Sequence, residues 1–159
     1  MKRTRFSHLD AAGAARMVDV GGKERTQRSA VASCVVLAPA RVIRAIRTQA
    51  VAKGDVLAVA RVAGIMAAKR TPDIVPLCHP LPLTRVDVTP VVVEDGVTIT
   101  AAAETTAQTG VEMEALTAVL AAALTVYDMT KGLDPAITID HACLLEKDGG
   151  KSGHWRRPE

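Results

Sequence analysis

Aromatic side chains are almost absent from this sequence of 159 residues, which has one Phe, one Tyr and one Trp. Surfaces that bind single-stranded nucleic acid stack bases on aromatic rings among clustered Lys and Arg, so we predict no nucleic-acid partner. Small apolar residues are abundant instead, with 27 Ala and 20 Val. Such side chains let helices approach closely but bury little area each, which favours additional burial between subunits. A hydrophobic content of 48% is typical of a globular protein.

Cysteines and long apolar runs are also scarce. The three cysteines, Cys34, Cys78 and Cys143, form no C-x-x-C pair, which argues against a disulfide framework or a structural zinc site. We expect them to be reduced core residues of a cytoplasmic protein. No apolar signal core follows Met1, and the longest uncharged apolar run, residues 115–127, is shorter than the ~20 residues of a membrane-spanning helix. The sequence therefore predicts a soluble protein.

Charge divides the chain into three parts of one domain covering residues 1–159. Residues 1–29 carry a net charge of +4, residues 30–146 carry −3, and residues 147–159 carry +2. We interpret the first part as a polar, mobile arm, the second as the folded core and the third as a basic tail. The length suits a single domain.

Hydrophobic periodicity within the core predicts an α+β fold. Strands are expected over 30–38, 86–93, 97–105 and 136–146, and helices after Pro39, over 56–70 and over 111–131. Asp55 is the expected N-cap of the second helix, and Gly132 the expected C′ residue of the third. Residues 75–84 contain three prolines and form an ordered loop. This order predicts a ferredoxin-like antiparallel sheet with helices on one face and one added helix.

The long helix separates two groups of charged residues. Glu112 and Glu114 lie near its start, Asp128 and Lys131 near its end, and sixteen residues of helix span roughly 24 Å. One small ligand cannot touch both groups of one chain. Either the ends belong to different sites, or neighbouring subunits each supply one end. Because the helix is apolar nearly all round, we predict an oligomer with shared sites.

Lysine is rare in the core, which has six arginines but only Lys53, Lys69 and Lys131. An ammonium group whose pKa falls on desolvation can transfer protons near neutral pH, which a guanidinium cannot do. Chance remains an alternative for three residues. Asp128 occupies a helix C-terminal turn, where a carboxylate is disfavoured by ~0.3–1 kcal/mol. A surface ion pair with Lys131 is the simpler explanation, and a functional site is the other.

Two further motifs invite a chemical interpretation. His79 lies in the proline-rich loop, where ligand contact competes with a purely structural role. Cys78 precedes it, but adjacent side chains diverge, so no Cys–His nucleophile is implied. Residues 149–152, Gly-Gly-Lys-Ser, resemble part of a phosphate-binding loop, but Leu145 stands where its first glycine belongs and no helix can follow.

The sequence resembles the molybdenum cofactor biosynthesis protein C family, the cyclic pyranopterin monophosphate synthases. The resemblance extends over nearly the whole chain in seven ordered segments. They are 17–20 (MVDV), 53–55 (KGD), 63–71 (AGIMAAKRT), 76–80 (PLCHP), 109–116 (TGVEMEAL), 123–129 (ALTVYDM) with Lys131, and 149–153 (GGKSG).

This resemblance implies a lyase of molybdenum cofactor biosynthesis. The expected reaction converts 3′,8-cyclo-7,8-dihydro-GTP, a cyclic dihydroguanosine triphosphate, to cyclic pyranopterin monophosphate with release of diphosphate. The implied assembly is a homohexamer, a trimer of dimers, with active sites at subunit interfaces. No cofactor or metal ligand is implied, although Mg²⁺ on the substrate phosphates stays open.

The resemblance also implies residue roles. Acid–base catalysis is expected from Asp128, Lys131 and Lys53. The expected substrate-binding residues are Leu77, Cys78, His79, Glu112, Met113, Glu114, Lys69, Arg28 and Asp19. The polar arm, which carries the last two, is expected to close over the substrate as a lid. Two alternatives remain: a non-catalytic ferredoxin-like module that binds a nucleotide or pterin for regulation, and a cysteine-dependent hydrolase that uses Cys78 and His79.

Overall fold

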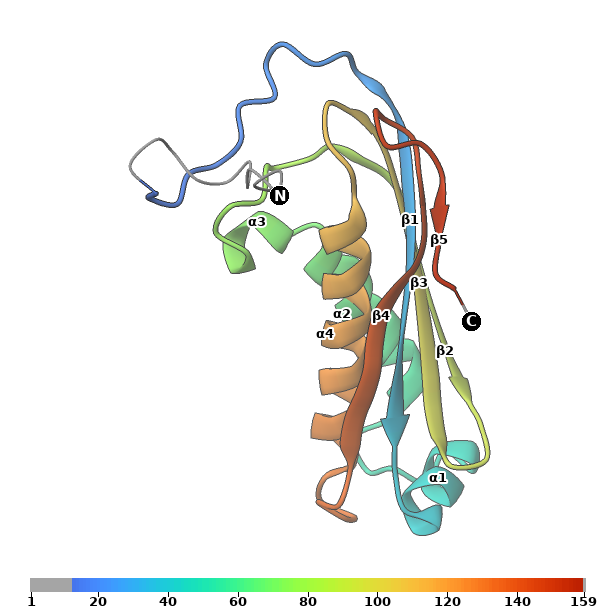
Figure 1. Cartoon of the computed structure of the whole chain (residues 1–159). Helices are drawn as coiled ribbons and strands as arrows, with labels where there is room; N and C mark the ends of the chain where they lie inside the picture. Colours follow the sequence, from blue (N-terminus) through green and yellow to red (C-terminus); the bar gives the residue numbers. More distant parts are fainter. Residues whose placement is uncertain (1–12, 159) are drawn as a thin grey trace.

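The computed structural model describes residues 13–158, which form one antiparallel sheet with helices packed on it (Figure 1). The elements in chain order are β1 (Thr26–Leu37), α1 (Ala40–Arg47), α2 (Val56–Ala68), α3 (Thr71–Ile74), β2 (Leu83–Val92), β3 (Gly96–Ala107), α4 (Glu112–Thr130), β4 (Thr138–Asp148) and β5 (Trp155–Arg156).

The sheet has the strand order β2-β3-β1-β4-β5, and every neighbouring pair is antiparallel. Without β5, this is the order of a ferredoxin-like fold, in which two strand–helix–strand units interleave. The predicted α+β class is therefore confirmed. Pro90 lies on β2, an edge strand, where its missing N–H removes no bond from the interior of the sheet.

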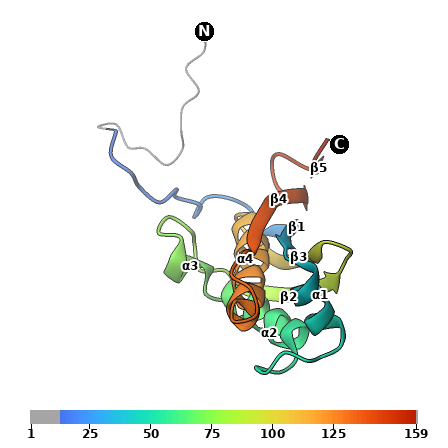
Figure 2. The same cartoon turned by 90° about the horizontal axis from the view of Figure 1, so that it is seen from below.

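The core lies between the sheet and the two long helices, α2 and α4, which cover one face (Figure 2). Alternate residues of β1, from Ala30 to Val36, point into it and are buried. Gly64 of α2 allows the close approach predicted from the small residues. A Cβ added there would lie 2.8 Å from the carbonyl oxygen of Ala118 on α4.

Several boundaries differ from the prediction. The central strand β1 begins at Thr26, so the described arm covers residues 13–25 rather than extending to 29. At the other end, β4 continues to Asp148 and pairs with β5, so part of the predicted tail belongs to the sheet. The four-residue helix α3 was not predicted. Gly132 does not have a positive φ, so no left-handed glycine ends α4.

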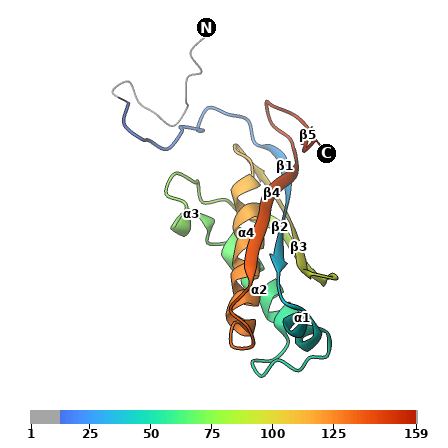
Figure 3. The same ribbon diagram turned by 60° about the horizontal axis from the view of Figure 1, so that its bottom comes forward.

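The described part of the arm contains no helix or extended strand and crosses above the N-terminal end of α4 (Figures 1 and 3). Three hydrogen bonds hold it there. Val18 O lies 2.8 Å from His79 Nε2, Gly21 O accepts from Gln108 Nε2 at 3.3 Å, and Arg25 Nη2 donates to the main chain at Thr106. The predicted arm residues 1–12 lie outside the described residues.

The helix α4 is long and apolar enough to cross a membrane by length and composition alone. In the fold, more than half of it is buried against the sheet and α2. Its buried apolar residues therefore belong to the core of the domain, while Leu120 and Leu124 stay exposed.

Candidate active site

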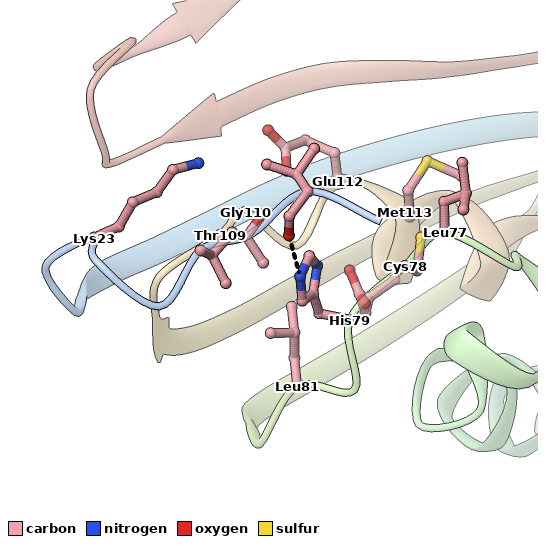
Figure 4. A pocket seen from close by; sticks show the side chains of 12 residues that line it. Lys23, Leu77, Cys78, His79, Leu81, Thr109, Gly110, Glu112 and Met113 are labelled. Atoms are coloured by element: carbon pink, nitrogen blue, oxygen red, sulfur yellow. Dashed lines mark hydrogen bonds between the residues drawn. The ribbon is translucent and has the colours of Figure 1, made fainter. Parts of the chain in front are cut away.

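A cavity of about 300 Å³ opens at the N-terminal end of α4 (Figure 4). Three segments enclose it: the arm, the proline-rich loop after α3, and the first turn of α4. Six of the nine predicted substrate-binding residues line it, namely Leu77, Cys78, His79, Glu112, Met113 and Glu114. Residues 77–79 of the loop and residues 112–114 of the helix, 35 positions apart in the sequence, therefore line the same cavity.

His79 lies in this cavity with a defined tautomer. Its Nε2 is 2.8 Å from Val18 O, and a carbonyl oxygen can only accept, so Nε2 carries the proton. The bond joins the loop to the arm (Figure 4). In a neutral ring, Nδ1 is then left as an acceptor.

Glu114 is the buried acid of the cavity, with a relative exposure of 3%. Burial disfavours the carboxylate and raises the pKa of Glu114 to about 7, while a hydrogen bond with its own backbone opposes this and the charge of Glu112 adds to it. A carboxyl group with a pKa near 7 can give or take a proton at neutral pH. The helix dipole favours an ionised carboxylate at this end of α4, so it does not account for the raised pKa of Glu114.

Cys78 is half-buried beside Glu114. Burial raises the pKa of the Cys78 thiol, and the neighbouring Glu114 raises it further. The nucleophile of a cysteine hydrolase is a thiolate, so this environment opposes the Cys78 alternative. The prediction that all three cysteines are core residues was wrong: Cys34 is in the core, whereas Cys78 and Cys143 are only partly buried.

The second group of predicted residues meets at the other end of α4. The Asp128 carboxylate accepts from Lys131 Nζ at 2.7 Å and from Lys53 Nζ at 2.9 Å. The same Lys53 amine donates to Asp128 O at 2.7 Å. Lys53 comes from the α1–α2 loop, 75 residues earlier in the chain.

Local sequence fixes the position of Lys53. Gly54 has a φ of 100°, a conformation that favours glycine, and turns the chain directly after the lysine. Asp55 then caps α2, as predicted, because its Oδ1 accepts from the backbone N–H groups of Leu57 and Ala58 at 3.0 Å each. The lysine is thereby anchored to the start of α2 while it reaches the end of α4.

The charges of this cluster differ from the expectation. Hydrogen bonds from Lys131 and then Lys53 lower the pKa of Asp128 to about 2. The same carboxylate raises the pKa of Lys131. The expected lowering of lysine pKa values by desolvation is wrong for Lys131, because its side chain is half-exposed and paired with an anion.

The two groups of residues are not brought together within one chain. The helix α4 runs unbroken from Glu112 to Thr130, so the predicted separation of roughly 24 Å holds. The cavity and the cluster are therefore two half-sites at opposite ends of one helix.

The remaining predicted residues lie around the cavity. Arg28 lines a neighbouring hollow, and Lys69 lines a shallow one that shares Leu81 with the cavity. Asp19 stabilises a turn of the arm, where its Oδ1 accepts from the N–H of Gly21 at 2.8 Å.

Six residues of the cavity were not predicted as site residues: Val18, Val20, Lys23, Leu81, Thr109 and Gly110. The last two belong to the Thr-Gly motif before the long helix, which could have identified them. Lys23 is one of seven basic residues of residues 1–29, and its spacing gives no signal.

Comparison with known proteins gives one consistent result. The model of the MoaC family matches residues 17–150. The cyclic pyranopterin monophosphate synthase of Streptomyces coelicolor is 56% identical over 96% of this chain and 90% of its own length. That of Thermomicrobium roseum is 57% identical over 97% and 94%, and cyclic pyranopterin monophosphate synthase 2 of Mycobacterium tuberculosis is 54% identical over 96% and 91%. This chain belongs to the MoaC family.

Proposed function

We propose that this protein is a lyase that forms cyclic pyranopterin monophosphate from 3′,8-cyclo-7,8-dihydro-GTP and releases diphosphate, in molybdenum cofactor biosynthesis. The observation that carries this proposal is the similarity, along almost the entire chain, to relatives named for that product. The similarity includes both half-sites. A purely regulatory binding module is not favoured, because the relatives are named as synthases.

The cavity is suited to the guanine-derived ring. A guanine edge presents neighbouring N–H donors, and a carboxylate can accept two of them. Glu112 and Glu114, which line the cavity, would accept these hydrogen bonds, and Leu77 and Met113 would supply apolar walls. With a pKa of about 7, Glu114 can also exchange a proton with a ring nitrogen during rearrangement.

The lysine–aspartate cluster is suited to proton transfer and charge stabilisation. At neutral pH Asp128 is ionised and Lys131 is protonated. Lys131 therefore starts as a proton donor, Asp128 orients both amines, and Lys53 is the second cation. Lys69 and Arg28 would stabilise the phosphates and the diphosphate leaving group, whereas neutral His79 offers only its Nδ1 acceptor to the substrate. No resident cofactor is proposed, and Mg²⁺, if required, would act on the substrate phosphates.

A complete site requires two chains in this proposal. Exposed apolar residues run along α2 and α4 between the half-sites: Val59, Val62 and Met66, with Leu120 and Leu124. Their burial against a second copy would remove this apolar surface from water. A two-fold axis across the middle of α4 would place the cluster of one copy at the cavity of the other. We propose a homohexamer built from such dimers, acting in the cytoplasm.

Mixing two inactive variants tests the shared site. Glu114→Gln disables the cavity and Lys131→Met disables the cluster, each in one half-site. If sites are shared, subunit exchange between the two variants restores turnover in mixed oligomers that contain one intact site. If the mixture shows no more turnover than the two variants measured separately, each site lies within one chain.

Diphosphate release from the cyclic intermediate tests the reaction itself. The unmodified protein should release diphosphate, and Lys53→Ala and Lys131→Ala should abolish release while the substrate still binds. Cys78→Ala changes one wall of the cavity and should reduce release only in part, whereas a cysteine nucleophile would require complete loss. No release by the unmodified protein would defeat the proposal, and loss in the cysteine variant alone would favour the hydrolase alternative.

The lid proposal concerns the described arm and the loop it contacts. Substrate should protect residues 13–25 from proteolysis if the arm closes over the cavity. Equal rates of cleavage with and without substrate would contradict closure.

A further inference from the structure

The carboxylate of Glu112 lies directly against the main chain of Gly110 at the cavity (Figure 4). A Cβ added to Gly110 would overlap Glu112 Oε2, and it would lie 2.7 Å from Glu112 Cδ and 2.8 Å from Oε1. These three atoms are the nearest neighbours of that position, and all are closer than the 3.0 Å below which real Cβ contacts essentially never occur. The carboxylate therefore occupies the space that any side chain at position 110 would need.

The main chain next to Gly110 is fixed by the core. Val111 is fully buried, and its carbonyl oxygen accepts from the N–H of Ala115 at 3.2 Å at the start of α4. Gly110 does not have a positive φ, so an alanine there would not strain the backbone. A larger residue at position 110 would therefore displace the flexible end of the Glu112 side chain and leave the fold intact.

Within residues 13–158, no hydrogen bond or ion pair holds the Glu112 carboxylate. The side chain is only half-buried, and a glutamate in such a place has several staggered rotamers available. Its contact with Gly110 thus restricts its position. Both carboxylate oxygens meanwhile keep lone pairs that can accept hydrogen bonds from a ligand.

The two acids of the cavity are therefore held in different ways. Glu114 is held by burial, with an exposure of 3%. The position of Glu112 depends instead on the absence of a side chain two residues earlier in the chain. A glycine that makes no polar side-chain contact of its own thereby controls where a ligand meets one of the two carboxyl groups.

We propose that Gly110 is a positioning residue for Glu112, and that the conformer it permits gives the cavity its preference for a purine-type ring with an exocyclic amino group. The inference rests on the proposed function, which places the guanine-derived ring in this cavity. An amino group donates to a carboxylate through a charge-assisted hydrogen bond, whose strength depends on distance and direction. Moving the carboxylate by the width of one methyl group breaks that bond.

Calorimetric titration with GTP and with ITP tests this preference without turnover. The two nucleotides differ only in the exocyclic amino group, which ITP lacks. The unmodified protein should bind GTP about 10-fold more tightly, the effect of one hydrogen bond to a charged group. Gly110→Ala should bind GTP only as tightly as it binds ITP. Gly132→Ala is the matched control, because its Cβ meets open space beyond the other end of α4, and it should keep the preference.

A double-mutant cycle with Glu112→Ala separates positioning from folding. If Gly110 acts through the Glu112 carboxylate, Gly110→Ala should not weaken GTP binding further once that carboxylate is removed. The midpoint of urea unfolding of Gly110→Ala should stay the same or rise, because alanine restricts the unfolded chain.

Three results would overturn the inference: equal binding of GTP and ITP by the unmodified protein, a preference for GTP that survives in Gly110→Ala, or a further loss of GTP binding in the Glu112→Ala background. A lower unfolding midpoint of Gly110→Ala would also contradict it, since the fold would then have moved. A preference that depends on Gly110, without turnover of the cyclic intermediate, would instead defeat the proposed function and leave the positioning role standing.

Discussion

The buried carboxyl group of Glu114 should make the stability of this protein fall as pH rises. Its pKa increases from 4.5 to about 7 in the folded protein, chiefly because of burial. The native state therefore holds the proton more strongly than the unfolded chain does. Below pH 4.5 both states are protonated and there is no effect. Between pH 4.5 and about 7 the unfolded chain ionises first, and the free energy of unfolding declines.

The size of this effect follows from the pKa change. One pKa unit corresponds to 1.36 kcal/mol, so the full change would cost about 3 kcal/mol above pH 7. Because the carboxyl group borders an open cavity, solvent screening reduces the expected cost to about 1–3 kcal/mol. Glu114→Gln removes the ionisation and keeps the shape. The variant should equal the unmodified protein near pH 4.5 and exceed its stability at pH 8 by that amount.

Urea unfolding at several pH values measures the difference, at one fixed protein concentration because association would add to stability. The matched control is Glu94→Gln in the exposed β2–β3 turn, which should change stability by less than about 0.5 kcal/mol throughout. The reasoning is refuted if Glu114→Gln is no more stable than the unmodified protein at pH 8.

Three other predictions test the packing and the second half-site. Gly64→Ala should destabilise the fold by about 1–3 kcal/mol although Ala is the better helix former, because its Cβ would press on an α4 carbonyl oxygen. Gly132→Ala is the control and should be neutral, because a Cβ there meets open space; thermal unfolding of both variants measures the difference. Asp55→Ala should cost about 0.5–2 kcal/mol in urea unfolding through loss of the α2 cap, and no loss would contradict the capping role. Lys131→Met should raise the pKa of Asp128, because it removes the strongest hydrogen bond to the carboxylate. NMR titration of the Asp128 carboxyl group measures this pKa, and an unchanged value would refute the pairing.

The longer elements were predictable because their signals are local. Alternation along β1 and β3, the Asp55 cap and the apolar length of α4 identify those elements from neighbouring residues alone. The shorter ones have no such signal. The two residues of β5 form a strand because they pair with Glu146 and Lys147, not because of their own propensity.

Pairing with β3 explains the misplaced boundary of the arm. Its first residues, from Thr26 to Ser29, are polar and resemble a loop in the sequence. In the fold they pair with β3 along their whole length. These backbone hydrogen bonds to a neighbouring strand are ones that hydrophobic periodicity cannot reveal.

By itself, the sequence determined the family, the fold class and the separation of two half-sites, since these depend on ordered motifs and on the length of one helix. Only the tertiary structure decided the ionisation of the site. It buried Glu114 and raised its pKa, and it joined Lys53 to Asp128 across 75 residues. It also placed Arg28 under the β4–β5 turn. A pKa depends on solvation and on charges nearby in space, and neither is specified by positions along the chain.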